Sequence, residues 1–226
     1  MSKSIAIIGG KQTGSVGRHL YENLSIENIM LPDLDVRSEK QIAQFFLENE
    51  NTFDGMVYSA GVYEYGSVKM MNLDSWEDTL KINLTGAMLC AKWYLRTQFY
   101  GGTLIFIGAN AAYAPSPGSS AYCVSKAGLL MLTQTLAQEN GPNYNFIQLD
   151  PGIIKDTNMY RDTYMRAGIS EEKMLERRLK AVPAGRCMEK AEIVQWVDFL
   201  LKKGKYVNGV GIRVDGGKIS ASGKEK

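Results

Sequence analysis

Tyr122 and Lys126 are the two residues of this 226-residue chain whose types and spacing are best suited to chemistry. On a helix, a gap of four residues places two side chains on one face, about one turn apart. An ammonium group beside a phenol favours the phenolate, so Tyr122 would exchange protons nearer to neutral pH than a free tyrosine does. We therefore predict that Tyr122 is a general acid and base and that Lys126 lowers its pKa. A second match to this spacing, Tyr65–Lys69, lies in a loop-like stretch and is interpreted as a solvated pair.

The segment before Tyr122 predicts how the pair is positioned. Residues 103–108 form a short apolar run bounded by glycines, which is typical of a buried strand. A loop rich in Ala, Pro, Ser and Gly follows over residues 109–120, and a helical pattern begins after it. Tyr122 and Lys126 would therefore open a helix just beyond the carboxyl end of a strand, where open α/β sheets bind their ligands.

A glycine-rich turn near the N-terminus predicts a phosphate-binding site. The apolar run Ser4–Ile8 is typical of a parallel strand buried on both faces, and Gly9 and Gly10 follow it. Gly14 and Gly17 lie where a helical pattern begins. Strand, glycine turn and helix together present backbone N–H groups and a helix N-terminus to a phosphate. Glycine is needed in such a turn because a Cβ would block the approach of a diphosphate.

Strands and helices alternate along the rest of the chain, which predicts an α/β fold with a parallel sheet covered by helices on both faces. Two separate strands do not fit around Asp33, because parallel strands need a crossover of about a dozen residues. The region of the second and third strands is therefore predicted to be shortened. Further strands are expected at residues 28–31, 53–60, 146–149 and 210–214, and longer helices at residues 74–98 and 189–203.

The C-terminal half also contains a less regular segment. Residues 153–186 are polar and rich in Met, Tyr and charges, and we predict that they form a cap over a substrate. Four of them either line the substrate or pack within the cap: Met159, Tyr160, Tyr164 and Met165. Residues 220–226 are predicted to form a loose tail.

Composition excludes several classes of protein. The formal net charge of +2 gives no basic footprint, so no nucleic-acid partner is expected. No apolar stretch approaches the length needed to span a bilayer, so no membrane partner is expected. The scattered residues Cys90, Cys123 and Cys187 are typical of reduced thiols in a cytoplasmic protein. With His19 as the single histidine, neither a Ser-His-Asp apparatus nor a metal site is predicted.

The ordered set of these features resembles the short-chain dehydrogenase/reductase family, from Ile5 to Gly217. The resemblance implies a single doubly wound Rossmann domain over residues 1–219, a homotetramer or homodimer, NAD or NADP as cofactor, and a small carbonyl/alcohol substrate. It is carried by six segments in order: Ser59-Ala60-Gly61, Ile82–Gly86, Tyr122 with Lys126, Asp150-Pro151-Gly152, Pro183–Arg186 with Glu192–Val194, and Asn208–Gly217.

The resemblance also implies roles for individual residues. Tyr122 would exchange the proton of the substrate oxygen, Lys126 would bind the nicotinamide ribose, and Asn83 would help a water chain relay protons. Asp33 is the nearest acid for the adenosine ribose and would favour NAD, whereas Lys11 or Arg37 would pair with a 2′-phosphate and favour NADP. The residues expected at the cofactor are Gly10, Gly14, Gly17, Asp35, Ala60, Gly61, Tyr122, Lys126, Pro151, Gly152 and Ile154.

The chain departs from the family pattern at its reaction centre. Ala109 occupies the position, thirteen residues before Tyr122, where the family has a catalytic serine that donates a hydrogen bond to the substrate oxygen. Losing such a donor costs on the order of a hundred- to a thousandfold in rate. Asn110 is the candidate replacement, and Ser119 and Ser120 are weaker ones. The last glycine of the turn, Gly17, also falls one residue late.

These departures leave three functions open. The first is an NAD(P)-dependent oxidoreductase that transfers a hydride between nicotinamide and a small carbonyl/alcohol substrate. The second is a catalytically impaired dinucleotide-binding or regulatory protein on the same fold, which the alanine at position 109 suggests. The third is non-redox chemistry at the same tyrosine, such as an isomerisation or an elimination.

Overall fold

A computed structural model describes residues 3–166 and 168–221, and its centre is a six-stranded sheet in which every strand pairs in parallel. The strand order is β2-β1-β3-β4-β5-β6. The chain reverses its direction across the sheet between β1 and β3, which is where doubly wound sheets bind ligands. The strands are β1 (Ser4–Ile8), β2 (Asn28–Met30), β3 (Gly55–Tyr58), β4 (Gly102–Ile107), β5 (Tyr144–Pro151) and β6 (Val210–Val214).

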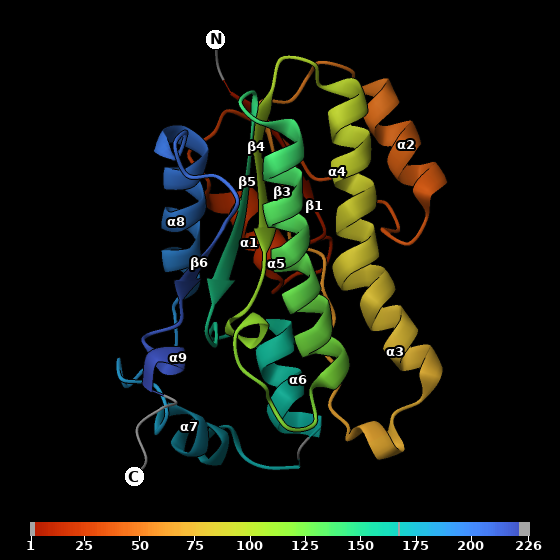
Figure 1. Ribbon diagram of the computed structural model, residues 1–226. Coiled ribbons are helices and arrows are strands. Elements are labelled where there is room, and N and C mark those ends of the chain that lie inside the picture. The colour runs from red at the N-terminus through yellow and green to blue at the C-terminus, as the bar shows by residue number, and fades with distance from the viewer. Residues whose placement is uncertain (1–2, 167, 222–226) are drawn as a thin grey trace.

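Helices cover both faces of the sheet, as predicted. Figure 1 shows α8 on one side of the strands and α4 and α5 on the other. Short 3₁₀ turns lie at Val68–Met70 and Asn110–Ala112. The helices are α1 (Val16–Asn23), α2 (Glu39–Glu48), α3 (Leu73–Leu80), α4 (Gly86–Thr97), α5 (Ser120–Asn140), α6 (Asn158–Arg166), α7 (Glu171–Leu179), α8 (Lys190–Lys203) and α9 (Lys218–Ala221).

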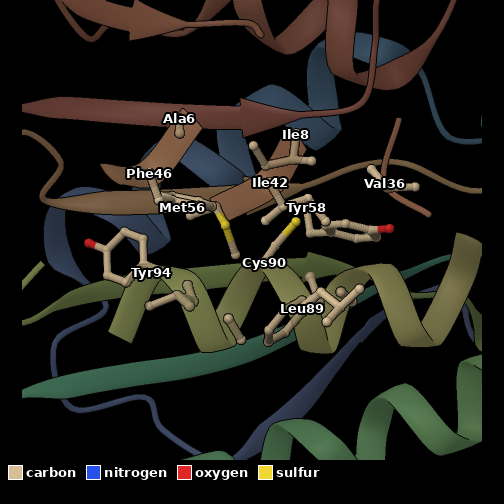
Figure 2. Close-up of a cluster of buried hydrophobic side chains, with 14 of the residues drawn as sticks. Ala6, Ile8, Val36, Ile42, Phe46, Met56, Tyr58, Leu89, Cys90 and Tyr94 are labelled. Atoms are coloured by element: carbon tan, nitrogen blue, oxygen red, sulfur yellow. The ribbon is translucent and has the colours of Figure 1, made fainter. Parts of the chain in front are cut away.

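The alternation of side chains along each strand divides the core into two clusters. Ile5 and Ile7 of β1 pack with α1 and α8, whereas Ala6 and Ile8 pack with α2 and α4. Figure 2 shows the second cluster, in which Phe46 of α2 and Tyr94 of α4 approach the sheet. Because both faces of the central strands β1, β3 and β4 are buried, these strands are nearly continuous apolar runs, which explains why the sequence predicted them.

The region between β2 and α2 is shortened, as the spacing of the residues predicted. β2 has three residues and pairs with β1, and the chain then passes through Asp33 and Asp35 to Ser38, which caps α2. The long helix predicted over residues 74–98 is interrupted. A π-helical turn, Lys81–Thr85, separates α3 from α4.

The cap region and the C-terminus hold the remaining helices. Figure 1 shows α6 and α7 beyond the ends of the strands towards which the arrows point. Ser220 and Ala221, predicted to be part of a loose tail, belong to α9, and residues 222–226 of that tail lie outside the described residues. Among the described residues, no helix is long and apolar enough to cross a membrane.

Candidate functional site

The predicted pair opens α5, directly beyond the end of β4. Lys126 is buried, and its Nζ donates a hydrogen bond to the carbonyl oxygen of Ile107, the last residue of β4, at 2.7 Å. The same ammonium lies 5.6 Å from the centre of the Tyr122 ring. The two side chains therefore share one helix face, but the ammonium is bound to a strand carbonyl and not to the phenol.

The protonation of this pair differs from the prediction. Burial raises the pKa of Tyr122 above its ordinary value, and the nearby Tyr63, Cys123 and Asp150 raise it further. The edge of the Tyr63 ring contributes to this burial, with ring centres 5.2 Å apart. Burial also lowers the pKa of Lys126 to about 8. The expectation that Lys126 lowers the pKa of Tyr122 is thus wrong for this arrangement, because desolvation outweighs the attraction of a cation directed elsewhere.

Asn83 joins the pair through the π-helical turn. Its side chain is fully buried, accepts from the Val62 N–H at 2.8 Å, and donates to the Val62 carbonyl at 3.0 Å and to Ser125 Oγ at 3.0 Å. The extra residue of the turn frees the Ile82 carbonyl, which accepts from the Tyr58 hydroxyl at 2.5 Å. Asn83 is therefore pinned between the segment after β3 and the helix that carries Lys126.

Gly61 lies beside these residues. A Cβ on Gly61 would stand 3.5 Å from Asn83 Oδ1 and 3.7 Å from Lys126 Nζ. Its neighbour Ala60 contacts the glycine turn, because the Ala60 N–H donates to the Ile8 carbonyl at 3.0 Å. The turn after β3 thus connects the glycine turn with the Tyr122–Lys126 pair.

The glycine turn is shaped by contacts that only glycine permits. Gly10 has a φ of +117°, and a Cβ there would lie 2.5 Å from the backbone of Gly17. A Cβ on Gly17 would in turn overlap the Gly9 carbonyl oxygen. Ser15 caps α1 by accepting from the Arg18 N–H at 3.2 Å. The late glycine therefore still brings the N-terminus of α1 against the turn.

The cap helix α6 lies across the same turn. The Asn158 N–H donates to the Gly14 carbonyl at 3.2 Å, and Asn158 Nδ2 donates to the Thr13 carbonyl at 2.9 Å. Arg161 Nη2 donates to Asn158 Oδ1 at 2.9 Å. Met159 on this helix lies against Tyr122, with the sulfur 4.0 Å from the hydroxyl oxygen. Asn158 and Arg161 were not recognisable from the sequence, because their contact depends on how the cap folds back.

The other cap residues proposed to line a substrate lie elsewhere. Tyr160 is buried in a separate cluster with Met174 and Cys187, and its hydroxyl donates to Glu171 at 2.5 Å. Tyr164 packs against that cluster, and Met165 is 69% exposed. Within this group, Met159 is the residue that meets Tyr122.

Asp150, at the end of β5, is a buried carboxylate that sequence reasoning did not single out. It accepts from the Ala109 N–H at 2.9 Å, from Gln148 Nε2 at 2.7 Å and from the Tyr113 hydroxyl at 2.8 Å. Burial raises the pKa of Asp150 to about 6 despite these donors. The sequence feature that could have identified Asp150 is a charged residue directly after the strand residues 146–149.

The predicted site residues Asn110, Gly152 and Ile154 differ in their surroundings. Asn110 lies in a 3₁₀ turn, and its Nδ2 is buried without a hydrogen-bond partner among the described residues. Gly152 donates from its N–H to the Val214 carbonyl at 3.2 Å. Ile154 is buried in the core cluster of α1 and α8 and bridges to Met188. Ile154 therefore packs in the core in this arrangement.

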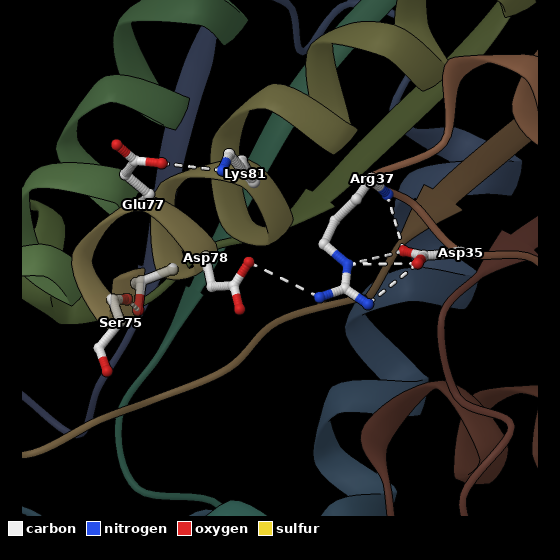
Figure 3. Close-up of polar contacts among 7 residues, drawn as sticks. Asp35, Arg37, Ser75, Glu77, Asp78 and Lys81 are labelled. Carbon is white, nitrogen blue, oxygen red and sulfur yellow. Dashed lines mark hydrogen bonds and ion pairs between the residues drawn. The ribbon is translucent and has the colours of Figure 1, made fainter. Parts of the chain in front are cut away.

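The acids expected near an adenosine ribose are paired with cations. Lys11 forms an ion pair with Asp33. Figure 3 shows Arg37 between two carboxylates, with Nη2 3.0 Å from Asp35 Oδ2 and Nη1 3.6 Å from Asp78 Oδ1. The hydrogen bonds from Arg37 lower the pKa of Asp35. An acid for the adenosine ribose and a base for a 2′-phosphate are thus both present. The preference for NAD or NADP therefore stays open.

Two further observations concern a cavity and metal binding. A cavity of about 300 Å³ lies between α7, α8 and β6, and neither Tyr122 nor Lys126 lines it. Within residues 3–166 and 168–221, no group of three or more His, Cys, Asp or Glu side chains could hold a metal ion.

The chain is similar to known oxidoreductases. Residues 10–218 match the family model described as "Enoyl-(Acyl carrier protein) reductase". The chain is 31% identical to a 3-oxoacyl-[acyl-carrier-protein] reductase of Aquifex aeolicus, over 82% of this chain and 74% of that protein. It is 29% identical to the "Inactive 2-(S)-hydroxypropyl-CoM dehydrogenase 2" of Xanthobacter autotrophicus, over 81% of this chain and 82% of that protein. Across such curated relatives, matches span 64% to 88% of the relative's own length.

A solved structure agrees with the fold. The gluconate 5-dehydrogenase of Burkholderia cenocepacia, described in complex with NADP and tartrate, superposes with a TM-score of 0.88. The superposition covers 97% of this chain and 96% of that chain at 22% identity. With a parallel doubly wound sheet, a glycine turn and a family model matching residues 10–218, the chain belongs to the short-chain dehydrogenase/reductase family of oxidoreductases.

Proposed function

We propose that the protein is an NAD(P)-dependent oxidoreductase that transfers a hydride between nicotinamide and a small carbonyl/alcohol substrate. The observation that carries this proposal is the convergence of Tyr122, Lys126 and Asn83 at the end of β4, beside the glycine turn. The proposed proton-transfer groups and the glycine turn thus both lie at the carboxyl ends of the parallel strands.

The residues of the turn fit a dinucleotide. Gly10 and Gly17 let the N-terminus of α1 approach the turn closely, because a Cβ at either position would overlap backbone atoms, and that N-terminus favours negative charge. When bound, the nicotinamide supplies or takes up the hydride. Ala60 and Gly61 would border the nucleoside, Asp35 the adenosine end, and Pro151 and Gly152 the nicotinamide end, whereas Ile154 packs in the core behind them.

Tyr122 would protonate the substrate oxygen during carbonyl reduction. Its raised pKa keeps the phenol protonated at neutral pH, so it holds the proton that the product alcohol needs. Lys126 would replace that proton, because a pKa of about 8 allows it to give up a proton under mild conditions, and Asn83 would help a water chain relay protons past Lys126.

Tyr122→Phe tests this proposal. Removing the proton donor should lower kcat by a hundredfold or more, since general acid–base catalysis contributes about 10² to 10⁴ in rate. Binding of NADH or NADPH should be retained. Turnover would be measured by nicotinamide absorbance over a panel of ketones, aldehydes and alcohols, and cofactor affinity by fluorescence titration.

The matched control is Tyr65→Phe, because Tyr65 has the same four-residue spacing to a lysine but is 63% exposed. It should keep wild-type turnover. A Tyr122→Phe protein with full activity would refute the proposed role of the phenol.

A second candidate is a dinucleotide-binding protein without redox activity. Ala109 has no hydroxyl to donate to a substrate oxygen, and one relative at 29% identity is named inactive. For the enzyme, we propose Asn110 as the replacement donor, because its buried Nδ2 has no partner among the described residues. Cofactor binding without turnover of any panel compound would favour the binding protein.

A further inference from the structure

Arg161, on the cap helix α6, is a cation that lies against the glycine turn. A Cβ on Gly14 would stand 2.8 Å from Arg161 Nη2, so the guanidinium closely approaches the turn. The Arg161 side chain is exposed, so a ligand in solvent can reach it. Arg161 therefore combines an accessible positive charge with a position beside the proposed site of the dinucleotide.

Asn158 fixes the direction of this guanidinium. Its backbone N–H donates to the Gly14 carbonyl at 3.2 Å, and its Nδ2 donates to the Thr13 carbonyl at 2.9 Å. Because Nδ2 is bound to the turn, Oδ1 is the atom of the amide that is left to accept, and it accepts from Arg161 Nη2 at 2.9 Å. The guanidinium is thus held beside the turn through hydrogen bonds that Asn158 makes on both sides.

Other cations of the turn and of the predicted adenosine end are already paired with acids. They form these ion pairs: Lys11 with Asp33, Arg18 with Glu22, and Arg37 with Asp35 and Asp78. In the part of the chain that the structure describes, Arg161 forms no ion pair with a carboxylate, and its hydrogen-bond partner Asn158 is a neutral amide. The charge of Arg161 therefore remains available to an anion.

The chemistry of this group suits an anion with several oxygens. A guanidinium carries several N–H donors in one plane, and Asn158 Oδ1 takes a single one of them. The others can donate in pairs to phosphate oxygens, in hydrogen bonds that the charges strengthen. The N-terminus of α1, which Ser15 caps, adds a partial positive charge at the same turn. Both features favour a diphosphate over a neutral ligand.

We propose that Arg161 binds the diphosphate of the dinucleotide and that Asn158 is the positioning residue that holds Arg161 towards the glycine turn. This inference rests on the proposed function, which supplies the cofactor. The backbone N–H groups of the turn and the guanidinium of the cap would share the phosphate oxygens. Because NAD and NADP have the same diphosphate, Arg161 would strengthen the binding of both and would not select between them.

Arg161→Gln tests the inference by binding alone. The Kd values for ADP, NADH and NADPH should each rise about tenfold at about 0.02 M salt, because a charge-assisted contact to phosphate is lost. The increase should narrow to about threefold at about 0.5 M salt, since salt screens the attraction of an exposed charge. Isothermal titration calorimetry measures the Kd values. Because Arg161 is exposed, the variant should fold as the wild type does, which circular dichroism checks.

Adenosine is the probe that separates a phosphate contact from a change in the turn itself. It carries no phosphate, so its affinity, measured by NMR titration, should be the same in the wild type and in Arg161→Gln. Equal losses of affinity for adenosine and ADP would show that the substitution disturbs the turn, which would overturn the inference. A loss confined to NADPH would assign Arg161 to the 2′-phosphate and would overturn it as well.

Arg177→Gln is the matched control. Arg177 is also exposed and forms no ion pair among the described residues, but it belongs to α7. Its removal takes the same charge from the cap, so the Kd for ADP should stay near the wild-type value. Arg161→Lys keeps the charge without the planar fork and should recover part of the lost affinity. Equal Kd values for Arg161→Gln and Arg177→Gln would contradict a local contact.

A double-mutant cycle tests the part of Asn158. In an Asn158→Ala background the guanidinium has lost its anchor, so Arg161→Gln should raise the Kd for ADP about threefold instead of about tenfold. The lost bond to the Thr13 carbonyl is common to both proteins of that background and cancels. If Arg161→Gln raised the Kd by the same factor in both backgrounds, the positioning role of Asn158 would be refuted.

These measurements separate the inference from the proposed function. A wild type that binds NADH or NADPH with an affinity that Arg161→Gln leaves unchanged would overturn the inference alone. A wild type that binds the dinucleotides through Arg161 but turns over no compound of the carbonyl and alcohol panel would overturn the proposed function alone. Arg161 would then be a diphosphate ligand of a binding protein.

Discussion

At the scale of single residues, burial decides the protonation of this site. Lys126 and Asp150 are both buried, and desolvation moves the pKa of each towards neutrality, to about 8 and to about 6. The pKa values of a lysine and an aspartate in water differ by about 6.5. The site therefore holds an acid and a base whose proton affinities are much closer than their types suggest.

Asp150→Asn should change how stability depends on pH. The pKa of Asp150 is raised from 3.8 to about 6, so the contribution of this group to folding is full below pH 3.8 and is lost as pH rises through 6. The loss amounts to about 3 kcal/mol. The free energy of unfolding of Asp150→Asn relative to wild type should therefore rise by up to this amount between pH 4 and pH 7.

Urea denaturation at the two pH values measures this difference. Other titrating groups are common to both proteins and cancel in the comparison. An unchanged difference between the proteins at pH 4 and pH 7 would show that Asp150 ionises as easily in the fold as in the unfolded chain.

The sequence pointed to the residues that we propose as reactive, but not to their surroundings. Tyr122, Lys126 and Asn83 are recognisable because their residue types and spacing are local information. The pKa of Tyr122 was predicted in the wrong direction, because local spacing does not reveal that Tyr63 and the cap cover the ring. Asp150 was recognised only as part of the Asp150-Pro151-Gly152 segment. Its place as a buried hydrogen-bond acceptor was not predicted, since its partners are brought together only by the pairing of β4 and β5.

At the scale of elements, irregular backbone positions the chemistry. The π-helical turn Lys81–Thr85 turns Asn83 inwards, and Gly86 after it leaves room for the Tyr58 hydroxyl. The sequence predicted one continuous helix here, because the apolar periodicity on both sides of the turn is helical. One extra residue in a helical turn changes the periodicity too little to be recognised in a single sequence.

Gly14→Ala should weaken dinucleotide binding. Gly14 has a φ of +84°, and a Cβ would lie 2.6 Å from Asn158 Oδ1 and 2.8 Å from Arg161 Nη2, so these two side chains of α6 must shift away from the turn. We expect the Kd for NADH or NADPH to rise at least about tenfold, which corresponds to about 1.4 kcal/mol. Isothermal titration calorimetry measures it.

Gly185→Ala is the control for backbone strain. Gly185 has a φ of +67°, but a Cβ there would meet no atom within 4 Å. Both variants should lose about 1–2 kcal/mol of stability from the left-handed conformation. Equal cofactor affinity in the two variants would mean that the contact between the turn and α6 has no part in binding.

At the scale of the whole molecule, the α/β class and the short edge strand β2 could be predicted from the sequence. Buried parallel strands are apolar and short, so their order along the chain and the α/β class followed from the sequence. The absence of room for a crossover near Asp33 predicted the reduced sheet, in which β2 forms one edge with three residues. The position of the cap over the turn was not predictable, because residues 153–186 lack a clear period.

The sheet should lose its order from the β2 edge. β2 pairs with β1 and has two exposed residues, Asn28 and Met30, whereas all four residues of β3 are buried between β1 and β4. Amides of residues 28–30 should exchange with solvent deuterium well before those of residues 55–58. Hydrogen-exchange mass spectrometry measures both, with the other edge strand, β6, as the comparison. Equal protection of β2 and β3 would contradict this gradient.

The seating of α6 on the glycine turn has a kinetic consequence. The same helix supplies Asn158 to the turn and Met159 to Tyr122, so it covers at once the proposed diphosphate site and the phenol proposed to react. A dinucleotide would have to enter before this helix settles, and a small substrate afterwards, which imposes a compulsory order of addition. The coenzyme would then be the last product to dissociate. Its dissociation, rather than hydride transfer, would limit kcat.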